Sequence, residues 1–152
     1  MSSIRAIMLG LVTFGVFSVL GLTAAYAQKP VKLKVAVIHA SKSVAKIDKR
    51  ISKRLAKSLK TESAFSQFKG FRLVSKSVLK LARGKAASVE LPTQEKAVIT
   101  YEGKAKRKHK LGLSIPKHKI QMKLKTPQKK LFYQAGIRHD QGILILAFYL
   151  KE

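Results

Sequence analysis

The chain of 152 residues contains no cysteine and no tryptophan, and only seven of its residues are acidic. The lack of cysteine excludes disulfide bonds, thiol chemistry and lipid attachment through a cysteine, so stability has to come from packing. The seven carboxylates include no close pair suited to acid–base work of the glycosidase type. The sequence also has no P-loop, no G-x-G-x-x-G motif and no EF-hand spacing. These absences predict a protein that is not an enzyme and uses no cofactor.

Four histidines are the remaining candidates for chemistry. His109 and His118 fall on the core-facing side of two neighbouring predicted strands, about four positions apart, which is too far for one shared metal ion. We expect both to be strand-end residues with their polar tips in solvent. His139-Asp140 could be half of a Ser-His-Asp set, but no G-x-S-x-G motif accompanies it, so a loop pair is the simpler interpretation. The sequence therefore predicts no metal site and no catalytic residue.

Basic residues are abundant: 25 lysines and seven arginines give the chain a net charge of +25. Such a charge attracts polyanions, and the excess of lysine favours diffuse attraction over bidentate recognition. Lysines on exposed sheet faces also keep strands soluble. Anion binding and simple solubility both explain this composition.

The first 27 residues have the order of a secretory signal peptide. A positive start, Met1 to Arg5, precedes an uncharged apolar run over 6–22 and small residues at Ala25 and Ala27. We predict cleavage after Ala27 and a single domain over residues 28–152, with an uncleaved anchor as the alternative. Cleavage would leave 31 basic and seven acidic residues, a net charge of +24. The predicted location is exported, either periplasmic or secreted.

Alternating apolar and polar residues predict strands along most of the remaining chain. The predicted strands are 31–39, 71–81, 87–91, 96–102, 109–115, 118–125 and 143–150, and the segment 131–137 precedes the last of them. The last segment is apolar on both sides, which is typical of a strand in the middle of a sheet. The predicted fold class is α+β, with a largely antiparallel sheet of about six to seven strands and one amphipathic helix packed on one face.

That helix is predicted from apolar residues spaced by three and four, after serines placed to cap its start. Its apolar face would consist of Val44, Ile47, Ile51, Leu55 and Leu59. Its other face would be basic, with Lys46, Lys49, Arg50, Lys53, Arg54 and Lys57. A basic amphipathic helix can lie on an anionic membrane, but this narrow aliphatic stripe favours packing on a core.

Two basic segments, KAKRKHK over 104–110 and PKHKIQMKLK over 116–125, are the main candidate site. We expect strands 108–115 and 118–125 to form a hairpin that turns at 114–117, placing Lys108, Lys110, Lys119 and Lys123 on one continuous cationic face. The full candidate set is Lys104, Lys106, Arg107, Lys108, Lys110, Lys117, Lys119, Lys123, Lys125, Lys129 and Lys130. No Phe or Tyr lies between Glu102 and Leu131, which disfavours base stacking.

The order of segments resembles a group of small, uncharacterised exported bacterial proteins. The resemblance rests on a first strand ending in IHAS, a basic helix with an Asp in its first part, a Phe-rich link, the strand FRLVSKSVLKL, a short strand ending in LP, and GILILAF near the end. The segment AGIRHDQG departs from the more glycine-rich pattern of that group. The resemblance implies a shared fold and export, and it carries no catalytic residue.

Together these patterns predict an exported, non-enzymatic binding protein. Its lysine-rich surface would contact anionic envelope polymers, lipid phosphates of a membrane surface, or nucleic acid without sequence specificity. The alternative is a structural or assembly component of the cell envelope that docks an acidic partner protein. The sequence indicates no small-molecule substrate.

Overall fold

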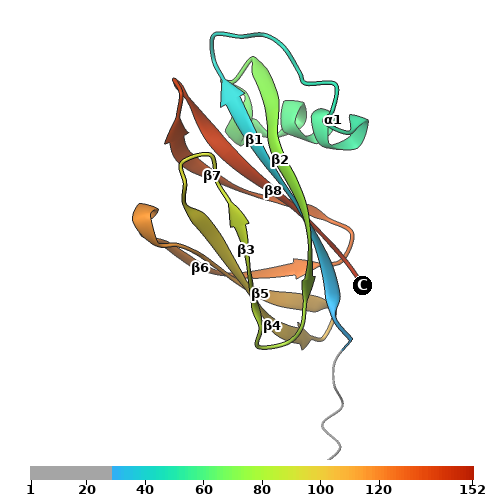
Figure 1. The fold of residues 1–152 in the computed structure, drawn as a ribbon. Helices are drawn as coiled ribbons and strands as arrows, with labels where there is room; N and C mark the ends of the chain where they lie inside the picture. The colour runs from blue at the N-terminus through green and yellow to red at the C-terminus, as the bar shows by residue number, and fades with distance from the viewer. Residues whose placement is uncertain (1–28) are drawn as a thin grey trace, which may run out of the picture.

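The structure, a computed structural model, describes residues 29–152. The predicted signal peptide, residues 1–27, lies outside the described residues. Two four-stranded antiparallel sheets lie one against the other, and a short helix covers one end of the first sheet on its outer side (Figure 1).

The first sheet has the strand order β2-β1-β8-β7. Its strands are β1 (Val31–Ser41), β2 (Gly70–Leu81), β7 (Leu131–His139) and β8 (Gly142–Lys151). The prediction that the last apolar run forms an interior strand is confirmed, because β8 lies between β1 and β7. The side chains on its two faces pack into two different cores, which explains why both the odd-numbered and the even-numbered residues of β8 are apolar.

The second sheet follows chain order, β3-β4-β5-β6. Its strands are β3 (Ala86–Glu90), β4 (Lys96–Ala105), β5 (Lys108–Ile115) and β6 (Ile120–Pro127). Each strand has one apolar face; on β5, Leu111, Leu113 and Ile115 are buried and the residues between them are not. These faces pack on the first sheet and form the main core with Leu33 and Phe148.

The predicted single sheet of six to seven strands is therefore wrong, and the protein is mainly β with eight strands. Strands with one apolar face can bury it against a second sheet as well as against a helix. The helix has nine residues and is about 14 Å long, which is too short to cover the apolar face of an eight-stranded sheet. Alternation alone does not distinguish these two arrangements.

The predicted helix is confirmed only over its second half, α1 (Lys53–Thr61). Ser52 caps its start, because its side chain accepts a hydrogen bond from the Leu55 backbone. Before it, Ile47 forms a parallel bridge with Phe71 of β2. Residues 42–52 therefore cross the edge of the first sheet, and their apolar spacing only resembles that of a helix.

A second, smaller core holds α1 on the outer face of the first sheet. Leu59 of α1 is fully buried there beside Ile38 and Ile145. Phe65 of η1 (Ser63–Phe65) and Phe68 are also buried, so the link after the helix folds onto this core. This second core ends before the lower part of the sheet, whose outer face α1 does not cover (Figure 1).

Candidate anion-binding surfaces

Strands β5 and β6 form the predicted antiparallel hairpin, but its four-residue turn lies at 116–119, two positions further along the chain than the predicted turn at 114–117. Pro116–His118 forms a 3-10 helix, η2, and Lys119 follows it with a left-handed φ of 53°. Lys119 therefore lies in the turn and not on the strand face where the sequence places it, whereas Lys117 lies in the turn as expected.

The displaced turn also changes the register of the hairpin. Leu113 faces Met122, whereas the predicted turn would place it opposite His118. On the outer face Lys110 lies directly opposite Lys125. Like charges at directly opposed positions repel each other, so this pair destabilises the sheet unless an anion lies nearby.

The hairpin's basic residues gather at the β4–β5 turn, where they line an open hollow of about 640 Å3. Its lining residues are Ala105, Lys106, Arg107, Lys108, Lys110 and Lys125. Within residues 29–152, no carboxylate lies within 4.0 Å of these five basic side chains. We call this set of five the turn cluster; its charge is uncompensated inside the described chain.

Three lysines of the candidate set occupy strained turn positions. Lys106, Lys119 and Lys129 have φ values of 56°, 53° and 58°. The left-handed region is uncommon for a residue with a long side chain, and asparagine or glycine adopts it more readily. The turns that connect β4 to β5, β5 to β6 and β6 to β7 thus each carry a lysine at a position where glycine or asparagine would adopt the same backbone conformation with less strain.

Lys104 does not belong to the turn cluster, in contrast to the prediction. A bulge in β4 between Tyr101 and Gly103 shifts the register, so Lys104 pairs with the inward-facing His109. Its ammonium group lies 2.6 Å from Oε1 of Glu152. The hydrogen bond from Lys104 lowers the pKa of the Glu152 carboxyl below its ordinary value of 4.5.

The predicted continuous cationic face is correct only in part: Lys108, Lys110 and Lys123 share the outer face, but acidic and neutral residues interrupt it. Lys123 lies 3.5 Å from Glu102, and Lys117 lies 3.8 Å from Glu95. The outer face of β5 also carries the neutral residue Ser114, which lies six residues, or about 20 Å, along the strand from Lys108, the first residue of β5. The basic residues form two groups, one at each end of the hairpin.

The predicted basic helix face is divided as well. Lys46, Lys49 and Arg50 precede α1, whereas Lys53, Arg54 and Lys57 belong to it. The Lys46 carbonyl accepts a hydrogen bond from the backbone of β2 and so forms part of the crossing segment.

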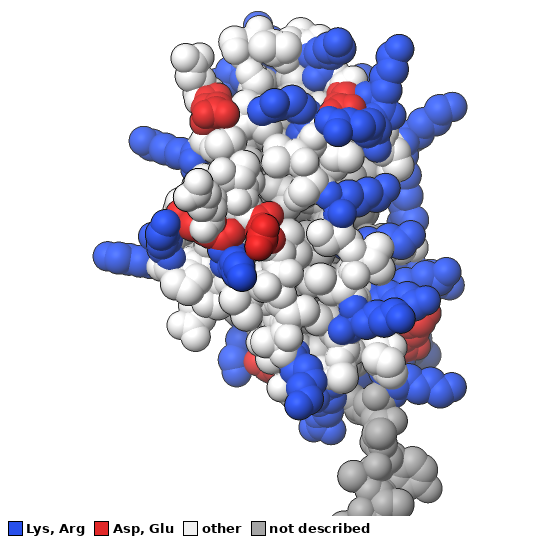
Figure 2. Space-filling model, viewed as in Figure 1, with Lys and Arg blue, Asp and Glu red and all other residues white. Residues whose placement is uncertain are grey.

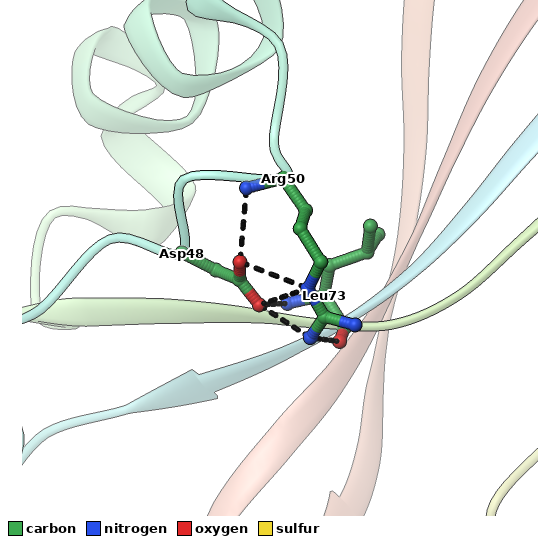
Figure 3. A network of polar contacts seen from close by, with 3 residues as sticks. All are labelled: Asp48, Arg50 and Leu73. Atoms are coloured by element: carbon green, nitrogen blue, oxygen red, sulfur yellow. Dashed lines mark hydrogen bonds and ion pairs between the residues drawn. The ribbon is translucent and has the colours of Figure 1, made fainter.

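Arg50 is engaged in a network that closes the edge of β2 (Figure 3). Its guanidinium group lies 2.6 Å from Oδ2 of Asp48 and donates a hydrogen bond to the Leu73 carbonyl. The Leu73 N–H donates in turn to Asp48. The hydrogen bonds from Arg50 hold the pKa of Asp48 well below its ordinary value of 3.8. Asp48 and Arg50 thus satisfy backbone groups that an edge strand would otherwise expose.

A second basic surface, which sequence reasoning missed, lies on the outer face of the first sheet beyond the helix. Lys32 of β1 faces Lys80 of β2 and Lys151 of β8. Lys34 and Lys76 lie on the same face of the sheet. The alternation within β1 indicates an outward lysine face, but the pairing of three strands that are distant in the sequence brings these residues together. In the view of Figure 2, basic side chains project from much of the outline and acidic ones are few.

His109 contradicts the expectation of a solvent-exposed tip, because it is fully buried at the end of the main core. Its Nδ1 lies 3.0 Å from the Tyr101 hydroxyl, and its Nε2 lies 3.3 Å from Glu152. Burial lowers the pKa of His109 and raises that of Tyr101. The imidazole therefore acts as a neutral, hydrogen-bonded part of the core.

Of the other two histidines of the prediction, His118 lies in a turn and His139 is the last residue of a strand. His118 is in η2, with Nε2 2.8 Å from Glu95. His139 ends β7 beside Asp140, which has a left-handed φ of 40°, and the side chains of these two residues approach to 3.2 Å. Turn geometry accounts for the His139-Asp140 pair.

Within the described part of the chain, no three His, Asp or Glu side chains gather as they would around a metal ion. None of the helices in residues 29–152 has the length and apolar character needed to cross a membrane. Comparisons with protein-family models, with curated proteins and with solved structures found no match to this chain.

Proposed function

We propose that this protein is an exported, non-enzymatic binding protein that contacts anionic polymers through the turn cluster. The observation that carries the proposal is the hollow of about 640 Å3 lined by five basic residues, with no carboxylate within 4.0 Å of them among residues 29–152. A phosphate or sulfate group in this hollow would be attracted by several positive charges at once and would displace the counterions around them.

Two features support binding over a purely solubilising role. The cross-strand pair Lys110–Lys125 places like charges side by side, and Lys106 holds a strained turn position. Solubility requires neither feature, because dispersed lysines on the same strands would serve it equally well. A bound anion between Lys110 and Lys125 would relieve their repulsion.

The composition of the cluster favours a polymer with closely spaced charges over a specific nucleic-acid sequence. Four of its five members are lysines, which act as point charges, and only Arg107 offers a planar fork of donors. No aromatic side chain lines the hollow, so a base has no surface on which to stack. The expected ligands are phosphate-rich envelope polymers, and nucleic acid would bind without sequence preference.

The test compares two triple variants with the same change in charge. Lys108→Gln/Lys110→Gln/Lys125→Gln removes three charges from the turn cluster. Lys117→Gln/Lys119→Gln/Lys130→Gln removes three charges from other turns of the same hairpin region. Binding to long-chain polyphosphate is measured from about 50 to about 300 mM salt, a range that includes physiological ionic strength.

We expect the cluster variant to reduce the slope of log K against log salt by about 1 for each lysine that contacts phosphate. The matched variant should keep most of the wild-type slope. Equal losses in both variants would contradict the proposal, because binding would then follow net charge and not the hollow. Binding that persists in high salt would contradict it too and would favour docking of an acidic partner through apolar contacts.

Export is part of the same proposal and has its own test. Cleavage after Ala27 would produce a mature chain that begins at Gln28, which intact-mass measurement of the protein recovered from its native compartment would detect. A retained leader would instead favour the membrane-anchored alternative.

A further inference from the structure

A second hollow, of about 330 Å3, lies between the start of α1 and the outer face of the first sheet. Its floor includes Ala36 of β1 and Ala147 of β8, which are cross-strand neighbours and both buried. Because their side chains are single methyl groups, they leave room above the sheet. The volume falls at the lower end of the range of small-molecule sites, about 300–1,000 Å3.

The walls of this hollow are also largely apolar. Leu55 comes from α1, Leu131 from the start of β7 and Tyr149 from β8. Val78 of β2 is the cross-strand neighbour of Lys34, which lines the hollow, and 57% of its surface is exposed. Val78 is therefore an exposed apolar side chain next to a lysine that lines the hollow.

Positive charges surround this apolar space. Lys34 and Lys76 line it from β1 and β2, and Arg54 lines it from the first turn of α1. The Arg54 guanidinium carbon lies 5.1 Å from the centre of the Tyr149 ring, and one N–H donates to the Lys129 carbonyl at 2.9 Å. These contacts hold Arg54 in place at the rim.

The three rim cations have no acidic counterpart in the part of the chain that the structure describes. Among residues 29–152, no carboxylate lies within 4.0 Å of Arg54, Lys34 or Lys76. The hollow thus combines an apolar floor with an uncompensated positive rim. A polyanion would use only the rim, and a neutral hydrophobic molecule would use only the floor.

We propose that this hollow binds one free anionic amphiphile. Its alkyl chain would lie on Ala36 and Ala147, and its carboxylate, sulfate or phosphate head would contact Arg54, Lys34 and Lys76. Burial of the chain provides the favourable free energy, and the rim cations select the sign of the head group. This site belongs to the first sheet and is separate from the turn cluster on the second sheet.

The first experiment uses Val78→Trp as a reporter, because the chain has no other tryptophan and this position is exposed beside the hollow. Dodecyl phosphate, kept below its aggregation concentration, should shift the tryptophan emission with saturation at one molecule per chain. Inorganic phosphate and dodecyltrimethylammonium should cause no saturable shift. A response to either control equal to that of dodecyl phosphate would overturn the proposal, as would binding only to vesicles of anionic phospholipid.

Charge-reversal variants then locate the site. Arg54→Glu/Lys76→Glu, made in the reporter background, should weaken dodecyl phosphate binding at least about tenfold, because two attractive contacts become repulsive. The matched pair Lys108→Glu/Lys110→Glu should leave it unchanged while weakening polyphosphate binding. Equal weakening of dodecyl phosphate binding by both pairs would overturn the proposal, and circular dichroism verifies that each variant is folded.

Discussion

Removal of one buried hydroxyl group tests the description of the main core most directly. Tyr101→Phe deletes the oxygen that lies 3.0 Å from Nδ1 of His109. The two residues are 2% and 0% exposed, so water cannot replace the lost partner. Because Glu152 lies 3.3 Å from Nε2, the neutral imidazole is expected to carry its proton on Nε2 and to accept the tyrosine hydrogen bond at Nδ1.

The magnitude follows from leaving Nδ1 buried and unsatisfied. Such a group costs about 1–3 kcal/mol in the free energy of unfolding. In a chain of this size, a loss of 1 kcal/mol lowers the melting temperature by about 3–6 °C. We therefore expect Tyr101→Phe to melt roughly 5–15 °C below the wild type.

A double-mutant cycle with His109→Leu gives the decisive measurement. Each single variant leaves one buried polar group without a partner, whereas Tyr101→Phe/His109→Leu removes both groups together. The double variant should therefore lose less stability than the sum of the single losses, with a coupling of about 1–3 kcal/mol. Urea unfolding followed by far-ultraviolet circular dichroism provides the three free energies.

Tyr133→Phe is the matched control. Its hydroxyl donates a hydrogen bond to Ser58 Oγ at 2.6 Å, but this pair is only partly buried. Water can satisfy the serine, so we expect a smaller loss of about 0.5–1.5 kcal/mol. A loss in Tyr101→Phe below that of the control, or strictly additive losses in the cycle, would refute the reasoning.

Three further predictions concern pH and the backbone. Burial lowers the pKa of His109 in the folded protein below its ordinary value of 6.5, so the unfolded chain binds more protons than the folded one as the pH falls below about 6.5. The free energy of unfolding should therefore decrease in this range, and His109→Leu should remove this part of the decrease. Urea unfolding midpoints at several pH values would show the difference. The pKa of Asp48 is lowered from its ordinary value of 3.8, so this carboxylate stabilises the folded protein above about pH 4 and loses that effect as the pH falls further. The difference in free energy of unfolding between the wild type and Asp48→Asn should therefore narrow only in acid. A difference that stays constant with pH would contradict the network. Gly70→Ala would place its new carbon 1.8 Å from a backbone oxygen and should lower the free energy of unfolding by about 1–3 kcal/mol. At Gly112 the nearest atom is 3.8 Å away, so the same substitution there should be neutral or slightly stabilising. Equal shifts in melting temperature for the two variants would argue against the close crossing of residues 42–52 over β2.

The strand faces were predictable because side chains alternate strictly along a strand. Leu111, Leu113 and Ile115 were expected on one buried face of their strand, and all three are buried. The two-sided apolar run of β8 likewise identified a strand covered on both faces. These predictions depend only on neighbours within one segment.

The helix was overpredicted because the same apolar spacing serves another purpose. Ile47 and Ile51 do contact the small core, but they reach it from a segment that crosses β2. The crossing is stabilised by Asp48 and Arg50, which bond to Leu73, a residue more than twenty positions away. A local pattern carries no information about such a partner.

Charge, the alternation of strands and the apolar face of each strand follow from the residues themselves, because each is a property of composition or of neighbours two positions apart. The register that opposes Lys110 and Lys125, and the bulge that turns Lys104 away from the outer face of the hairpin, depend on the pairing of consecutive strands. The grouping of eight strands into two sheets depends on contacts between distant segments. The amphiphile hollow has the same origin, since its floor and rim come from β1, β2, α1, β7 and β8. Long-range pairing was needed to turn a lysine-rich chain into two separate, differently shaped basic surfaces.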